Sequence, residues 1–321
     1  MDTELRRFDV CVVAHVTRDV IRIGSAQRSG PGGVAYYAGL TLRRLGRSVA
    51  VVTKMAAEDR SELLEELHDE GITVLCGDSA ETTAFLNETE EGDPDSRVQT
   101  VSSVAAPFVP SDLGGVHADW FYLGPLLNRD MSVDFARSVR KRGRIVLDAQ
   151  GLVRKLEAER IRASRPAETQ PWMRLVSLLK LDAHEAATLT EAGGIEDAAR
   201  RLYAFGVREV IVTSAGKGST IFDGRDFQYI DAVPGKALDS TGCGDTYLAA
   251  YLDRRLASND PGFSGRFAAT AATLALENEG AFRASASDVR ARMPCAGRSS
   301  PLFKSRTIPP PFGAKRPAPH R

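Results

Sequence analysis

Short runs of apolar residues alternate with amphipathic segments along most of the chain. An apolar run of four to eight residues between turn residues is typical of a buried strand, and apolar positions three or four apart are typical of a helix against a core. The pattern predicts buried strands over Phe8–Ala14, Ser48–Lys54, Trp120–Leu123, Arg144–Asp148, Leu175–Lys180 and Glu209–Thr213. It predicts helices over Val34–Leu45, Ser61–Glu70, Ser132–Arg142, Glu185–Ala192 and Ile195–Phe205.

The order of these elements predicts the fold class. Strands that alternate with amphipathic helices form a doubly wound α/β fold, a mostly parallel sheet with helices on both faces. Residues 17–31 and 82–104 depart from this rhythm, because polar and apolar side chains alternate there. Such alternation is typical of an antiparallel sheet with one solvated face. We therefore expect a second, smaller β-sheet, with the acidic segment Glu88–Asp95 as a solvated hairpin tip.

Charge is unevenly distributed along the chain. The formal net charge is zero, with 42 basic and 42 acidic residues. Residues 294–321 contain six of the bases, no acid and seven prolines, a composition that predicts a disordered, inert tail. Residues 1–293 then carry 36 bases against 42 acids, a net charge of −6. A mildly acidic body gives no reason to predict nucleic-acid binding.

Cysteine usage and hydropathy predict the compartment. The four cysteines are scattered, with no Cys-x-x-Cys pair and no histidine at zinc spacing. This usage predicts reduced thiols and a cytoplasmic protein. The apolar run Val10–Val16 is far shorter than the roughly 20 apolar residues of a membrane-spanning helix. It also contains His15, and so we predict a buried strand and no membrane partner.

The segment Asp239-Ser240-Thr241-Gly242-Cys243-Gly244-Asp245 carries the strongest chemical signal. It ends where a helical stripe of Leu248, Leu252 and Leu256 begins. Glycines before a helix turn backbone N–H groups toward one point, at the positive end of the helix dipole, which suits a phosphate or a phosphoryl group in transfer. Asp245 beside such a loop suits removal of a proton from an attacking hydroxyl. The simpler alternative is a helix N-cap in which Asp245 only caps.

This segment resembles the D-T-x-G-x-G-D signature of the ribokinase, or PfkB, carbohydrate kinases, with Ser240 in place of the usual threonine. The resemblance implies that Asp245 is the catalytic base and that the N–H groups of Gly242, Cys243 and Gly244 stabilise charge on the transferring phosphoryl oxygens. Because Asp245 lies at a helix N-terminus, we expect its pKa to be depressed. The resemblance also implies a monovalent cation, such as K⁺, near Asp239 and Thr241.

A second motif resembles the sugar-binding signature of the same family. The diglycine Gly32-Gly33 opens a predicted helix, where backbone can approach a ligand closely. The resemblance implies that Asp19 accepts hydrogen bonds from substrate hydroxyls. Tyr37, Gln150 and Arg154 are further candidates for substrate binding, and together with Tyr36 they bring the chain closest to the inositol-kinase-like and archaeal sugar-kinase branch. Helix packing for the tyrosines and a surface position for Arg154 are open alternatives.

Three further segments resemble the nucleotide and metal sites of the family. Lys180–Glu185 is similar to the family's N-x-x-E segment, which implies that Asp182 and Glu185 bind Mg²⁺ through water; a helix N-cap is the alternative, and both roles can coexist. Thr213–Ser219 is not a Walker A loop, because Gly218 follows Lys217 and position 212 is valine. The candidate ATP contacts are Asp182, Glu185, Thr213, Gly216, Gly218, Asn278 and Ala281.

The motifs follow the family's order across residues 8–293. This implies one ribokinase-like kinase domain over residues 1–293, with lid strands from about 17–31 and 82–104 that exclude water from the site. The implied activity is ATP-dependent phosphorylation of a hydroxyl of a small sugar or polyol, by a monomer or homodimer. Two alternatives remain open: a nucleoside kinase of the same fold, and a non-catalytic binding or scaffold protein.

Overall fold

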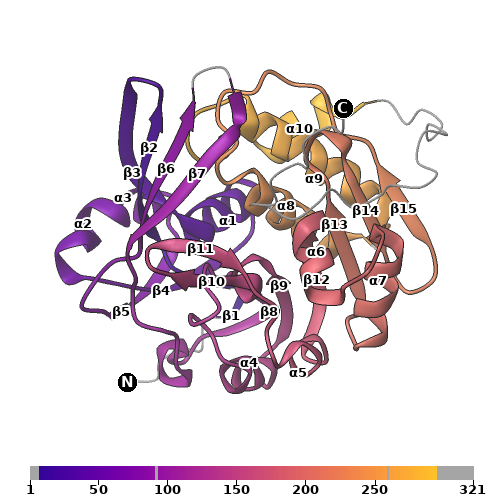
Figure 1. Cartoon of the computed structure of the whole chain (residues 1–321), viewed down its shortest axis with the longest axis horizontal. Helices are drawn as coiled ribbons and strands as arrows, with labels where there is room; N and C mark the ends of the chain where they lie inside the picture. Colours follow the sequence, from indigo (N-terminus) through magenta and orange to yellow (C-terminus); the bar gives the residue numbers. More distant parts are fainter. Residues whose placement is uncertain (1–6, 91–92, 259, 295–321) are drawn as a thin grey trace, which may run out of the picture.

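The main sheet has nine strands in the order β15-β14-β13-β12-β9-β8-β1-β4-β5 (Figure 1). The structure, a computed structural model, describes residues 7–90, 93–258 and 260–294. All neighbouring strands from β5 to β13 pair in parallel, whereas β14 is antiparallel to both β13 and β15. The strands are β1 (Arg7–Val13), β4 (Val49–Met55), β5 (Thr73–Asp78), β8 (His117–Leu123), β9 (Arg144–Asp148), β12 (Val176–Asp182), β13 (Glu209–Thr213), β14 (Ser219–Phe222) and β15 (Phe227–Ile230).

Helices cover both faces of this sheet, as the alternating pattern predicts. Successive residues of a buried strand point to opposite faces, so Val10 and Val12 enter one core cluster and Cys11 and Val13 the other. The first cluster is covered by α1 (Gly33–Arg44), α2 (Arg60–Leu63), α3 (Glu65–Asp69), α8 (Cys243–Ala257), α9 (Pro261–Leu276) and α10 (Ala286–Arg292). The second is covered by α4 (Val133–Arg140), α5 (Thr169–Met173), α6 (Ala183–Thr190) and α7 (Ile195–Ala204). Four short 3₁₀ turns lie between these elements: η1 (Ala57–Asp59), η2 (Pro110–Leu113), η3 (Gln150–Val153) and η4 (Ala215–Lys217).

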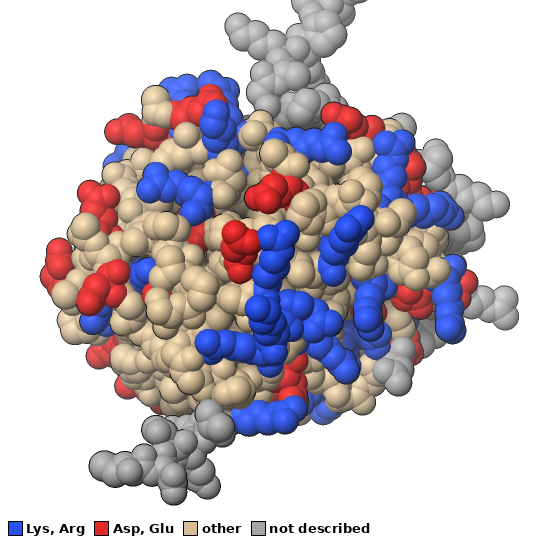
Figure 2. Space-filling model, turned by 90° about the horizontal axis from the view of Figure 1, so that it is seen from below, with Lys and Arg blue, Asp and Glu red and all other residues tan. Residues whose placement is uncertain are grey.

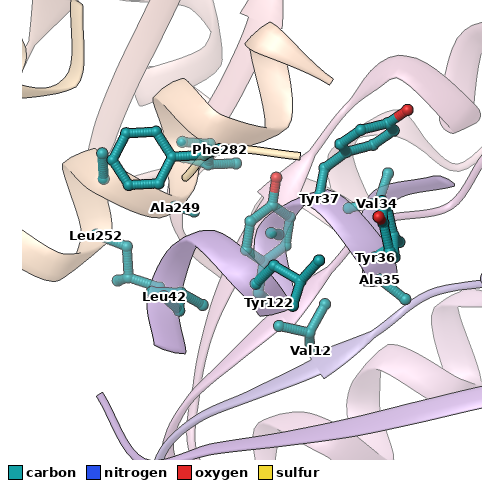
Figure 3. Close-up of a cluster of buried hydrophobic side chains, with 14 of the residues drawn as sticks. Val12, Val34, Ala35, Tyr36, Tyr37, Leu42, Tyr122, Ala249, Leu252 and Phe282 are labelled. Carbon is teal, nitrogen blue, oxygen red and sulfur yellow. The ribbon is translucent and has the colours of Figure 1, made fainter. Parts of the chain in front are cut away.

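Tyr122 of β8 lies in the first core cluster and carries a polar group into it. Its ring is fully buried and lies among side chains of α1 and α8, including Val34 and Leu252 (Figure 3). Its hydroxyl is buried and has no hydrogen-bond partner among the described residues. A buried hydroxyl without a partner costs about 1–3 kcal/mol, and so it calls for a reason.

A second sheet of six strands, in the order β10-β11-β7-β6-β2-β3, projects from one end of the molecule (Figure 1). The predicted lid segments 17–31 and 82–104 supply four of these strands. The hairpin of β10 and β11 supplies the other two, and the sequence pattern did not predict it. The strands are β2 (Thr17–Ile23), β3 (Ala26–Gly32), β6 (Ala84–Glu90), β7 (Asp93–Ser103), β10 (Arg154–Glu157) and β11 (Arg160–Ala163).

The surface below the main sheet is rich in basic side chains. Figure 2 shows Lys and Arg gathered across the middle of this face. The segment from Arg137 in α4 to Arg144 at the start of β9 alone contains five basic residues. No helix in the described ranges is long and apolar enough to cross a membrane. The predicted basic tail, residues 294–321, lies outside the described residues apart from Pro294.

Candidate active site

Two buried, oppositely charged side chains meet near the carboxyl ends of β9 and β12. Asp148 and Lys180 are direct partners in the parallel register of these strands, and Lys180 Nζ lies 2.9 Å from Asp148 Oδ2. Burial alone lowers the pKa of Lys180, but the charges of Asp148, Glu185 and Asp245 outweigh it and raise the pKa above the usual value. A buried, permanently charged ammonium therefore lies at the sheet edge where open α/β folds bind ligands.

The glycine-rich loop before α8 closes over this pair. A side chain at Gly244 would lie 3.1 Å from Lys180 Nζ, so the ammonium approaches the backbone at the start of the helix. Gly242 has φ +76°, a conformation that favours glycine, and a side chain there would overlap the ring of Tyr37. The amide of Cys243 makes a long 3.3 Å contact with Ser240 O. The predicted loop thus brings Gly242, Cys243 and Gly244 together at the N-terminus of α8.

Asp245 follows this loop in the first turn of α8. Burial, followed by the negative charge of Asp148, raises the pKa of Asp245 to about 7, although Lys180 and Arg154 oppose the shift. The expectation of a depressed pKa is therefore wrong, because burial beside another carboxylate outweighs the helix dipole. A carboxyl with a pKa near 7 is a stronger base than an ordinary aspartate, which suits proton abstraction.

Asp182 and Glu185 form a capping box at the start of α6. Asp182 Oδ1 accepts the amides of His184 and Glu185 at 2.8 Å each, and Glu185 Oε2 accepts the amide of Asp182 at 2.8 Å. The capping role is therefore present. Burial, followed by the charge of Asp182, raises the pKa of Glu185 to about 8.

A divalent cation fits this acidic cluster. Asp182 and Glu185 each use one carboxylate oxygen in the cap, so their second oxygens are left for water or an ion. A bound cation would also offset the cost of burying the charged Glu185 carboxylate, because it would add to the positive charges of Lys180 and Arg154, which lower the pKa of Glu185. Within the described ranges no group of three or more acidic, His or Cys side chains forms a complete metal cage. Mg²⁺ does not require a complete protein cage, because it usually keeps several waters and also binds substrate phosphates.

The predicted substrate-binding residues lie at the base of the lid sheet. Asp19 of β2 is buried and accepts a 2.7 Å hydrogen bond from Thr17 Oγ1. Its carboxylate lies where a side chain at Gly32 would be, so glycine is needed there for this close approach. Gly33 has φ +81° and lies against His15 O. The diglycine therefore shapes the wall behind Asp19.

Tyr37 and Arg154 face the same region. Tyr37 is buried against Gly242, and burial and the charges of Asp19, Asp239 and Asp245 raise its pKa. Tyr37 thus has a packing role in this structure. Arg154 begins β10, and its charge lowers the pKa values of both Asp245 and Glu185.

Gln150 lies beside Asp148, in η3. Its backbone N–H donates to Asp148 Oδ1 at 3.1 Å, and the residue is half-buried.

The predicted nucleotide loop follows β13. Thr213 Oγ1 lies 3.5 Å from Leu181 O, and Gly216 is open on the side where a side chain would project. Gly218 has φ +85°, and a side chain there would overlap Ile230 O of the neighbouring strand β15. Next to it, the hydroxyl of Ser214 is buried without a partner among the described residues. An orphaned hydroxyl beside an open glycine fits a loop that binds a ligand.

The remaining predicted nucleotide contacts follow α9. Asn278 is exposed, and its amide donates to Leu274 O at 2.7 Å. Ala281 is buried in the first core cluster beside Phe282. The structure therefore brings the backbone of this turn to the surface near Asn278 and takes the side chain of Ala281 into the core.

The predicted monovalent cation site is occupied by a guanidinium group. Arg28 of β3 donates to and pairs with Asp239 Oδ2. The other oxygen, Oδ1, accepts the amide of Thr241 at 2.9 Å, and the amide of Gly280 lies 3.4 Å from Oδ2. Asp239 thus faces donors on both oxygens. A free K⁺ does not fit this carboxylate.

Sequence analysis missed three residues of this site: Lys180, Tyr122 and Arg28. Lys180 stands in the segment compared with the family, but its role depends on pairing with Asp148 across two strands. The pKa of Tyr122 is raised first by burial and then by the charges of Asp245 and Asp148, so its partnerless hydroxyl lies close to the acidic cluster. Arg28 is 211 residues from Asp239 in the sequence, and no local pattern reports such a pair.

Comparison with known proteins gives one family. The model of the pfkB family of carbohydrate kinases matches residues 7–287. A cytidine kinase from Thermococcus kodakarensis is 25% identical over 264 residues, which cover 76% of this chain and 87% of that protein.

Solved structures agree on the fold. A pyrophosphate-dependent kinase in the ribokinase family, complexed with a pyrophosphate analogue and myo-inositol, superposes with a TM-score of 0.80 and 27% identity, covering 88% of this chain and 99% of the other. Ribokinase of Arabidopsis thaliana, complexed with ribose and ATP, superposes with a TM-score of 0.72 and 18% identity, covering 90% of this chain and 99% of the other.

Proposed function

Because the chain belongs to the pfkB family of carbohydrate kinases, we propose that it transfers the γ-phosphoryl group of ATP to a hydroxyl of a small polyol of the inositol or sugar type. The observation that carries this proposal is the position of Asp245. Its carboxyl, with a pKa near 7, lies at the N-terminus of α8 beside the buried Lys180 and Asp148. These are the groups that phosphoryl transfer to an alcohol requires: a base, a cation and backbone donors.

In the proposed reaction, Asp245 orients the substrate hydroxyl and accepts its proton as the new O–P bond forms. The bond between the γ-phosphorus and its bridging oxygen breaks, and ADP leaves with the electron pair. The amides of Gly242, Cys243 and Gly244 and the ammonium of Lys180 stabilise charge on the transferring oxygens. Asp182 and Glu185 would hold Mg²⁺ through water, and the ion, when bound, supplies positive charge to the phosphates.

The polar wall of the site favours a polyol as acceptor. Asp19 offers an acceptor for hydroxyl donors, and the half-buried Gln150 and Arg154 offer donors. The structure complexed with myo-inositol, at 27% identity over most of both chains, supports the same class. The cytidine kinase relative makes a nucleoside the second candidate acceptor.

The donor is the second part of the proposal. The buried hydroxyl of Ser214 and the open face of Gly216 support ATP, since they lie where the resemblance places the nucleotide. The solved relative that depends on pyrophosphate makes pyrophosphate the competing donor. Pyrophosphate has no adenosine group, so the turn at Asn278 would have no part of this donor to contact.

A panel assay tests the proposed reaction. We expect phosphorylated product with inositols or sugars and ATP, measured by mass spectrometry, so that both donors and all acceptors are read in one way. If only nucleosides were phosphorylated, the acceptor would be a nucleoside and not a polyol. If product formed with pyrophosphate but not with ATP, the donor would be pyrophosphate. No product from any pair would contradict the kinase and favour a binding protein.

The variant Asp245→Asn tests the base. It removes the proton acceptor but keeps the side-chain shape, so we expect kcat to fall by about 10²- to 10⁴-fold, with ATP binding retained and the melting temperature not lowered. Asp134→Asn is the matched control, because Asp134 also lies in the first turn of a helix, α4, and is exposed. Near-normal turnover in Asp245→Asn would show that another group takes the proton.

A further inference from the structure

The lid sheet reaches the catalytic loop through one charged side chain. Arg28 lies in the middle of β3, paired with Ile21 of β2, in the sheet that covers the site. Its guanidinium donates to Asp239, which stands six residues before Asp245 in the loop leading to α8. Only 8% of the Asp239 side chain is exposed to solvent, against 39% of the Arg28 side chain, so the carboxylate is the shielded member of the pair.

Asp239 in turn fixes the backbone of this loop. Its Oδ1 accepts the amide of Thr241 at 2.9 Å, immediately before Gly242. Its own amide and that of Leu238 both donate to Leu276 O at the end of α9. Through its carboxylate and its backbone amide, Asp239 therefore connects three segments: the strand β3, the loop before α8 and the end of α9.

A carboxylate held this far from solvent needs a positive charge beside it. Removing one partner of a shielded ion pair leaves an uncompensated charge, which is far more costly than the pair is stabilising. Arg28 is the residue of the lid that supplies this charge. Guanidinium is always protonated and forms a fixed geometry with carboxylate, so it is suited to a permanent structural role.

We infer that Arg28 takes the place of a free monovalent cation at Asp239, and that it couples lid position to the geometry of the Gly242–Gly244 loop. The inference deepens the kinase function proposed above and rests on it. Two consequences follow. Catalysis by this chain does not depend on K⁺, and a lid that opens withdraws the charge that holds the catalytic loop. Arg28 is thus a positioning residue that acts through Asp239.

The variant Arg28→Gln tests this inference in two independent ways. In buffers of equal ionic strength made with tetramethylammonium, Na⁺ or K⁺ chloride, we expect wild-type kcat/KM and melting temperature to be independent of the cation. Arg28→Gln in tetramethylammonium should lose about tenfold or more in kcat/KM and melt at a lower temperature. K⁺ should restore much of both losses, because it can now enter beside Asp239.

Two further variants serve as comparisons. Arg28→Lys keeps the charge and should retain most of the activity without K⁺. Arg22→Gln is the matched control, since Arg22 lies in the same sheet and pairs with Glu88 at 2.6 Å, with both side chains exposed. It should not respond to the cation.

Three results would overturn the inference: wild type that K⁺ activates or stabilises, Arg28→Gln with unchanged activity and melting temperature, or Arg28→Gln whose losses no monovalent cation restores. The melting measurement needs no substrate. It therefore decides the question of the cation even if the panel assay shows no kinase product.

Discussion

Lys180 is the residue that most changes the view of this site. It lies buried between Asp148, Glu185 and Asp245, next to the backbone of Gly244. Its charge offsets the surrounding carboxylates in the free protein. In the proposed reaction, the same charge stabilises the transferring phosphoryl oxygens.

Variants that remove the charge of Lys180 should show whether it acts on stability, on turnover or on both. Lys180→Met leaves Asp148 buried without its counter-charge, which costs about 3–5 kcal/mol in the free energy of unfolding. The double variant Asp148→Asn/Lys180→Met removes both charges, so most of that stability should return. Turnover should stay at least ~100-fold below wild type in both variants, because the ammonium group of Lys180 is absent.

Thermal melting and the product assay check this prediction, with the exposed Lys155→Met as control. Recovery of turnover in the double variant would show that Lys180 acts only on stability.

The raised pKa of Asp245 has a direct consequence for pH dependence. The ionised carboxylate is the form that accepts a proton, and so kcat/KM should rise with pH through a midpoint of about 7. The free energy of unfolding depends on pH in the opposite direction. Asp245 keeps its proton up to about pH 7 in the folded protein, whereas its pKa in the unfolded chain is 3.8. The contribution of Asp245 to stability is therefore full below pH 3.8 and is lost as the pH rises through 7.

Both parts of this pH prediction are measurable. A pH–rate profile gives the midpoint, and melting curves of wild type and Asp245→Asn give the stability difference. Relative to wild type, Asp245→Asn should gain stability as the pH rises from 3.8 to about 7. A rate midpoint near 4 would show that the helix dipole dominates after all.

At the scale of elements, helix α1 packs against α8 and also contacts the glycine immediately before it. The ring of Tyr37 in α1 fills the space where Gly242 would carry a side chain, just before α8. Tyr122 of β8 lies below, between the same two helices (Figure 3). The catalytic loop therefore rests on the first helix of the chain, so a change in either helix moves the loop.

Gly242→Ala tests this contact. The positive φ alone costs roughly 1–2 kcal/mol for an L residue, and Gly46→Ala measures that cost by itself, because φ is +96° and no atom lies within 4 Å of the added group. Gly242→Ala should destabilise the protein by more than Gly46→Ala and should lower kcat, because the loop must shift away from Tyr37. Equal melting temperatures and normal turnover in the two variants would contradict this account.

The sequence pattern predicted the long elements well and the short ones poorly. The strands β9 and β13 have the predicted bounds, since each is a continuous apolar run flanked by turns. The hairpin of β10 and β11 was missed because its strands have four residues each and are rich in charge. The predicted helix Ser61–Glu70 is two short helices that meet at Leu64.

For the whole molecule, the fold class was predictable and much of the site was not. Alternating periodicity predicts the doubly wound sheet, and the glycine-rich motif predicts the loop that precedes α8. The Asp148–Lys180 pair depends on strand register, and the Arg28–Asp239 pair depends on how the lid sheet docks. The raised pKa of Asp245 depends on burial. These three features arise from tertiary structure, so no local pattern contains them.

The contact between Gly32 and Asp19 also bears on how such proteins diversify. The carboxylate fills the volume that any larger residue at position 32 would need, so the side chain allowed at one position depends on the other. A lineage that exchanges the acid for a smaller group becomes free to accept bulk at position 32, and its acceptor preference changes with it. Paired, rather than single, substitutions at these positions are therefore the natural route for directed evolution of a new specificity.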